Sequence, residues 1–211
     1  AAIELRDGLD RLSRERIRAE MMKLLVAKNA AATLLVMRDD GFLDHVLAGV
    51  AHVEAMARID GKDAVVRLGA LALDSRSDVD RLCERLRLSN AEATRLDAMA
   101  KALEHFHSGP IIRAEACRFA WAHGAEAAKD AALLLAAREP GRDTQELTRA
   151  AADRPAKSPF SGADLMARGL PAGPALGRIL AAAETSWARS GFPKAEAEVE
   201  ALLKAAIASQ S

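Results

Sequence analysis

Two aspartates form the pair whose type and spacing come nearest to metal-dependent chemistry in this 211-residue chain. Asp78 and Asp80 read Asp-x-Asp, and two carboxylates on one strand can hold metal ions that activate a hydroxyl group. Here the pair leads into a helical pattern, where residues two apart point about 200° from each other. We therefore expect it to contribute to the electrostatics of a helix start, with Ser77 as the N-cap, and not to bind metal.

Histidines are the second set of candidate ligands. A helical metal phosphohydrolase would need an adjacent His-Asp pair, and the sequence contains none. Because His105 and His107 are two residues apart, they point to opposite sides of a helix. We interpret the histidines as surface or capping residues and expect no metal site; they are His45, His52, His105, His107 and His123.

The composition favours helices over sheets. Hydrophobic residues make up 50% of the chain but aromatic residues only 3%, and tyrosine is absent. No run approaches about 20 consecutive apolar residues, so we expect no membrane span, and the charged residues of 1–12 exclude a signal peptide. Cys83 and Cys117 stand alone, as in reduced thiols of a cytoplasmic protein.

Net charge limits the classes of partner. Thirty acidic and thirty basic side chains give a formal charge of zero, whereas nucleic-acid-binding domains are usually strongly basic. RNA binding would therefore need a local patch. Arg149, Arg154, Lys157, Arg168 and Arg178 outnumber the acids around them, so the C-terminal part is the better candidate.

Periodicity predicts helices along almost the whole chain, separated by turn residues. The expected segments are 12–25, 30–38, 42–58, 65–73, a helix opened by a capping box at Ser89 and Glu92 and running to 106, 111–121 and 125–138. We predict an all-α fold, an elongated array of antiparallel helix pairs with a small helix-hairpin tail. The predicted units are 1–28, 29–150 and 151–211, with a proline-containing linker at 151–159.

The first helix has a complete local signature. Ser13 is a good N-cap, and Leu12 can pack on Ile17 as a hydrophobic staple. Arg16 and Glu20 lie one turn apart and can form an ion pair.

The tail reads as two helices joined by a turn. Ser161 can cap a short helix, Gly169 can end it in a left-handed conformation, and Pro174 suits the first position of the next helix. Gly173 and Gly177 leave bare backbone there. That backbone can accept a phosphate, helped by Arg178, or Gly177 can let two helices approach closely. In the second case the core face comprises Leu176, Ile179, Leu180, Ala183 and Trp187.

These two segments together resemble one enzyme family. The pattern S-x-E-R-I-x-x-E is matched by Ser13, Glu15, Arg16, Ile17 and Glu20. The pattern S-G-x-D-L followed by G-x-x-x-G-P-x-x-G is matched by Ser161, Gly162, Asp164, Leu165, Gly169, Gly173, Pro174 and Gly177, with weaker echoes at 67–73 and 85–90. The chain thus resembles the C-terminal neck, body and tail of bacterial class II CCA-adding tRNA nucleotidyltransferases and the related poly(A) polymerases.

The resemblance implies a set of roles. Residues 1–28 would be a neck abutting a catalytic head that this chain lacks, with Ser13, Glu15, Arg16 and Glu20 supporting the head. Lys157, Arg168, Gly173, Gly177 and Arg178 would bind tRNA or another RNA 3′ end region. The family's Mg²⁺ and CTP or ATP would belong to the head, so we expect no cofactor in this chain.

The same resemblance leaves several points open. The family's E-D-x-x-R nucleotide-selecting motif is absent, so this chain alone should not add nucleotides, and CCA addition and poly(A) addition are not distinguished. Without a head, an apolar face around Ile3, Leu5 and Leu9 should be exposed. The alternative is a helical protein-interaction adaptor with no RNA role, which would be indifferent to tRNA.

Overall fold

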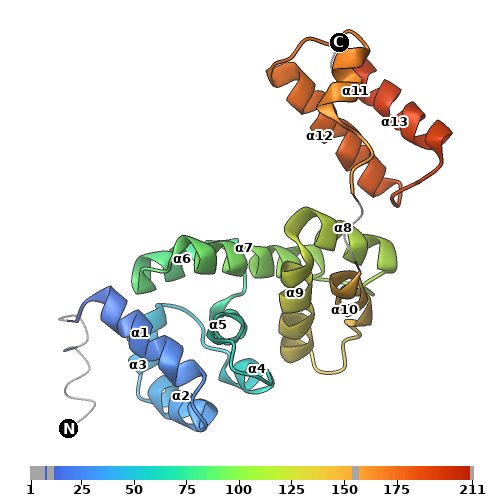
Figure 1. Cartoon of the computed structure of the whole chain (residues 1–211). Helices are drawn as coiled ribbons and strands as arrows, with labels where there is room; N and C mark the ends of the chain where they lie inside the picture. The colour runs from blue at the N-terminus through green and yellow to red at the C-terminus, as the bar shows by residue number, and fades with distance from the viewer. Residues whose placement is uncertain (1–7, 9–11, 154–156, 210–211) are drawn as a thin grey trace.

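The computed structural model describes residues 8, 12–153 and 157–209. Within these residues it contains thirteen α-helices and no β-strand, which confirms the all-α prediction (Figure 1). The helices are α1 (Arg14–Leu25), α2 (Ala30–Asp39), α3 (Phe42–Leu47), α4 (Val53–Ala57), α5 (Ala64–Ala72), α6 (Arg76–Leu86), α7 (Asn90–His105), α8 (Arg113–His123), α9 (Ala125–Arg138), α10 (Gln145–Ala152), α11 (Gly162–Ala167), α12 (Pro174–Arg189) and α13 (Glu196–Ala208).

Helix α1 begins where its local signature predicts. Ser13 is extended, and its hydroxyl accepts a hydrogen bond from the Arg16 amide at 3.2 Å. The polar face differs from the expectation, because Glu20 accepts a hydrogen bond from Lys23 at 2.9 Å instead of pairing with Arg16. The guanidinium of Arg16 therefore stays exposed on the helix surface.

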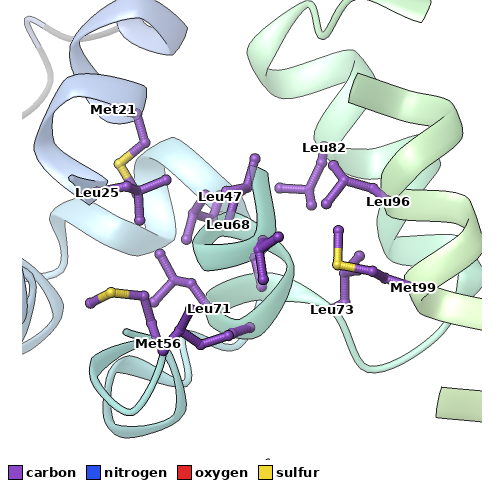
Figure 2. Packing of buried hydrophobic residues seen from close by; sticks show 14 of the residues in the cluster. Met21, Leu25, Leu47, Met56, Leu68, Leu71, Leu73, Leu82, Leu96 and Met99 are labelled. Atoms are coloured by element: carbon purple, nitrogen blue, oxygen red, sulfur yellow. The ribbon is translucent and has the colours of Figure 1, made fainter. Parts of the chain in front are cut away.

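Helix α5 lies at the centre of the largest hydrophobic core. Figure 2 shows Leu68 and Leu71 of α5 surrounded by side chains from α1, α3, α4, α6 and α7. A Cβ atom at Gly69 would lie 2.9 Å from the Met99 sulfur, so the two helices α5 and α7 approach closely there. This core fixes α1 and α2 against the middle of the chain.

The single helix predicted over 42–58 is wrong, because the chain forms two short helices, α3 and α4. Ala48 ends α3 in a left-handed conformation, with φ of 52°. The guanidinium of Arg81 donates to the Leu47 carbonyl and occupies the space beside Gly49, and Arg85 donates to the His45 carbonyl. Side chains from α6 thus satisfy the carbonyls that a continuous helix would have bonded itself.

Asp78 lies in the first turn of α6 and Asp80 follows two residues later on the same helix, as expected, but the N-cap is Ser75 and not Ser77. The Asp78 carboxylate accepts the amides of Asp74 at 2.7 Å and of Ser75 at 2.8 Å. Burial alone would raise the pKa of Asp78, but these amides and the guanidinium of Arg81 outweigh it and hold the pKa below its ordinary value. Asp78 therefore stabilises the start of a helix.

Two helices were not predicted, α10 and α13. Helix α10 packs on α8 and α9 through the buried side chains of Leu147 and Ala150, and it extends to Ala152, inside the predicted linker. Helix α13 packs on α12, so the described tail is a three-helix unit and not a two-helix hairpin. Neither helix has a strong start or stop signal in the sequence, and tertiary contacts hold both in place.

The tail stands at the end of the molecule away from α1 and meets the rest of the chain at α8 (Figure 1). Its core contains the Trp187 ring, which lies 6.3 Å from Trp121 of α8 and 5.0 Å from Phe192. The indole N–H of Trp187 donates to the Pro193 carbonyl at 2.8 Å. The expected docking of the tail on the body therefore occurs through an aromatic contact.

Candidate nucleic-acid interface

The exposed face of α1 carries the residues that the sequence assigns to head support. Glu15, Arg16 and Glu20 are all exposed, while the hydroxyl of Ser13 is used in capping. Arg16 and Glu20 stand at a groove of about 260 Å³ that also contains apolar side chains from α1, α2 and α3. The apolar members are Leu12, Ile17, Met21, Met37, Phe42 and Val46. The predicted apolar face at Ile3, Leu5 and Leu9 lies outside the described residues.

The turn between α11 and α12 has the geometry that its sequence predicts. The Ser161 hydroxyl accepts the Asp164 amide at 3.2 Å and begins α11. Gly169 has a φ of 85°, and Pro174 is at the first position of α12, directly after Gly173. The expected core face of α12, from Leu176 to Trp187, packs into the tail core.

Gly177 lies on the surface of the first turn of α12. No atom lies within 4 Å of the position that a Cβ atom would take there, so Gly177 does not mediate a close approach of two helices. Gly173, Gly177 and the exposed Arg178 are thus brought together around the helix N-terminus. The amides of Leu176 and Gly177 donate to the Gly173 carbonyl, so the helix dipole and the Arg178 guanidinium are the groups here that suit a phosphate.

The other two predicted RNA-binding residues have different surroundings. Arg168 forms two hydrogen bonds to the Glu200 carboxylate, both at 2.7 Å, and this guanidinium lowers the pKa of Glu200. Arg168 would have to exchange this exposed partner for a phosphate. Lys157 is exposed in the linker, and no contact within the described residues joins it to the α12 turn.

A further cleft lies between α7 and α8, with a volume of about 440 Å³. It contains His105 and His123, which we expected at ordinary surface or capping positions, together with the basic side chains of Lys101 and Arg118. The sequence signal that could have indicated it is Phe119 and His123, one turn apart on a predicted helix. The meeting of α8 with the end of α7 could not be read from the sequence.

Nowhere in residues 8, 12–153 and 157–209 do three or more His, Cys, Asp or Glu side chains gather closely enough to hold a metal ion. Among the helices of these same residues, none has the length and apolarity needed to cross a membrane.

Comparison with known proteins finds a family match at the N-terminal end of the chain. A family model described as "Probable RNA and SrmB-binding site of polymerase A" matches residues 1–53, which include α1, α2 and α3. This match confirms the resemblance to the C-terminal region of the poly(A) polymerase and CCA-adding enzyme family, and it supports an RNA-binding region of a polymerase. No curated protein matches the chain significantly.

Proposed function

We propose that this chain is the RNA-holding and structural region of a nucleotidyltransferase that adds nucleotides to RNA 3′ ends. The observation that carries the proposal is the match of residues 1–53 to a polymerase RNA-binding region. The described helices of this segment, α1 to α3, pack into the largest core. In the intact enzyme a catalytic head would bind Mg²⁺ and CTP or ATP. This chain would supply RNA contacts and support to that head.

RNA would be held at two ends of the molecule. Near the N-terminus, Arg16 and Lys28 are exposed and form no ion pair with another described residue. At the tail, Arg178 lies beside the bare backbone of Gly173 and Gly177, and Lys157 lies in the linker that precedes α11. Phosphates and 2′-hydroxyl groups, and not base sequence, are what such contacts recognise in duplex RNA, as in the acceptor half of tRNA.

We propose that the catalytic head docks on the groove beside α1. Its wall is apolar, and Arg16 and Glu20 border it with opposite charges. In the resembled family, α1 follows the catalytic domain, so the head would lie on this side. Buried apolar area would supply affinity, and the two charged side chains would fix the orientation through charge-assisted hydrogen bonds.

RNA binding is tested by a fluorescence-anisotropy titration with tRNA that lacks its CCA end, at about 50 and 200 mM salt, beside an unstructured RNA of equal length. We expect salt-sensitive binding that prefers tRNA. Arg168→Ala with Arg178→Ala should weaken binding, and so should Arg16→Ala with Lys28→Ala. Lys62→Ala is the matched control, since Lys62 is exposed in a loop away from both surfaces. Failure to bind either RNA would contradict the proposal.

Head support is tested in the intact enzyme. Arg16→Ala should reduce nucleotide addition even at RNA concentrations that saturate binding, and Lys62→Ala again serves as the control. Full activity of the Arg16→Ala enzyme would show that the groove does not orient the head.

The apolar groove also favours a second candidate function, a helical adaptor that docks another protein. The two functions differ in their response to RNA. An adaptor would bind its protein partner through Ile17 and Phe42 and would show the same negligible affinity for tRNA and for unstructured RNA.

A further inference from the structure

The cleft between α7 and α8 combines rings and cations in one place. It is lined mainly by Lys101, Glu104, His105, Arg118, Phe119 and His123. Its volume of about 440 Å³ falls within the range of small-molecule sites, which runs from about 300 to 1,000 Å³. The family match ends at residue 53, so this cleft lies outside the matched region.

Three rings meet in the cleft, with their planes inclined to one another. Phe119 is buried at the floor, with its ring centroid 4.7 Å from that of His123 and 6.4 Å from that of His105. Phe106 packs behind Phe119 at 5.5 Å and holds the floor in place. Flat π-systems of this kind offer stacking faces to nucleobases without selecting among sequences.

Two cations stand beside these rings. Lys101 contacts the Asp97 carboxylate at 2.7 Å, and Arg118 contacts Glu115 at 3.6 Å. Each of these contacts uses only part of the donor capacity of an ammonium or guanidinium group, and both side chains are partly exposed. Glu104 is the one carboxylate in the described lining, and it accepts the amide of Arg76 at 3.2 Å. Lys101 and Arg118 therefore keep N–H donors that can bind a phosphate, while Asp97 and Glu115 balance their charges.

The histidines add hydrogen-bonding groups. Burial lowers the pKa of His123, and Lys101 and His105 lower it further against the opposing effect of Asp97. At neutral pH its imidazole is uncharged and has one donor and one acceptor. These groups can pair with a base edge, which a purely apolar cleft could not do. The same mixture of charges disfavours an apolar peptide as the occupant.

We propose that this cleft binds one ribonucleotide of single-stranded RNA, with the base against His105, Phe119 and His123 and the phosphate at Lys101 and Arg118. The proposal rests on the proposed RNA-binding function and adds a single-strand site to it. Helix α8 also presents Trp121 to the tail, on the side opposite to Phe119 and His123. The cleft thus lies on the helix that contacts the tail.

The test is an anisotropy titration of the chain with a labelled eight-nucleotide single-stranded RNA, beside free AMP and CMP as competitors. His123→Ala should weaken binding by about tenfold, the cost of losing one stacked base. Arg118→Ala should weaken binding and lower the salt slope by about one. His107→Ala and Lys129→Ala remove an exposed histidine and an exposed lysine outside the cleft and should leave affinity unchanged.

A second measurement follows the unmodified chain, so that misfolding of a variant does not decide the result. In ring proton–carbon NMR spectra, the His105 and His123 signals should shift when the RNA is added, and the His107 signal should not. A chain that binds no RNA would overturn this proposal and the proposed function together. RNA binding with unshifted His105 and His123 signals, or with full affinity in both cleft variants, would overturn the cleft alone. Saturation by free AMP or CMP with no preference for RNA would assign the cleft to a mononucleotide and also overturn the proposal.

Discussion

The arginines before the linker and those after it have different surroundings, although the chain as a whole has no net charge. Among the described residues before the linker, nearly every arginine donates to a carbonyl or a carboxylate. Arg95 illustrates this, since it contacts Asp130, which is 1% exposed, at 2.5 Å. In the tail only Arg168 has such a partner, whereas Arg178 and Arg189 are exposed without an ion pair to another described residue.

This difference teaches that net charge is a poor guide to the charge available for binding. A guanidinium that satisfies buried carbonyls contributes to folding, and moving it toward a phosphate would orphan those carbonyls. An exposed, unpaired guanidinium costs little to redirect. Substitution of an arginine before the linker should therefore lower the stability of the fold, whereas substitution of an unpaired tail arginine should lower RNA affinity.

Arg81→Ala should have the largest effect on stability. Arg81 donates to the carbonyls of Leu47 and Ala72 and pairs with Asp78 at 2.7 Å, so its loss removes the donor of two carbonyls and the cation beside Asp78. We expect a loss of roughly 3 kcal/mol in the free energy of unfolding. Urea unfolding followed by circular dichroism measures it, and Arg189→Ala in the tail is the matched comparison. Equal losses of stability in the two variants would contradict the difference between the arginines before and after the linker.

Gly69→Val tests whether close helix packing, in addition to arginine hydrogen bonds, stabilises the body. The added side chain would meet Met99, which is fully buried, at the contact between α5 and α7. We expect a loss of about 2 kcal/mol in the free energy of unfolding. Gly177→Val is the tail counterpart; there a Cβ atom would meet no atom within 4 Å, and valine has a higher helix propensity than glycine, so we expect no loss of stability. Similar losses at both positions would contradict the description of the α5–α7 contact.

Acid should destabilise the body through Asp78. Its folded pKa is lowered, so its contribution is complete above the ordinary value of 3.8 and is lost as the pH falls from there through the folded pKa. Asp78→Asn should therefore be less stable than the parent by about 1 kcal/mol at pH 7, with the gap closing below about pH 4. Thermal unfolding between pH 2 and 7 measures the gap. A stability difference that does not change with pH would show that packing, and not the Asp78 charge, is responsible for it.

Arg178→Ala should have the smallest effect on stability, below about 0.5 kcal/mol, because the side chain is exposed and unpaired within the described structure. Its effect should appear in RNA binding, where the salt slope should fall by about one. Arg118→Ala and Arg178→Ala, tested singly and together, would show whether the cleft and the tail contribute independently. An unchanged salt slope in Arg178→Ala would show that Arg178 does not contact RNA phosphates.

Local chemistry determined much of this fold. The hydroxyls of Ser13, Ser89 and Ser161 begin the helices that their positions predict, because an N-cap needs only the first turn that follows it. Pro174 and Gly169 act in the same local way, since their backbone preferences are intrinsic. The all-α class follows from the same residues and from the composition.

Tertiary structure decided the rest. The break between α3 and α4 depends on Arg81 and Arg85, which come from more than thirty residues away, and no local pattern announces it. Whether Gly177 is covered, whether Arg168 has a partner, and whether His123 stands beside His105 depend on which helices meet. The sequence by itself determined which segments are helical and where many begin, because those choices involve neighbouring residues. Only the packed structure decided which cations are free and which rings share a cleft, because those depend on contacts between distant segments.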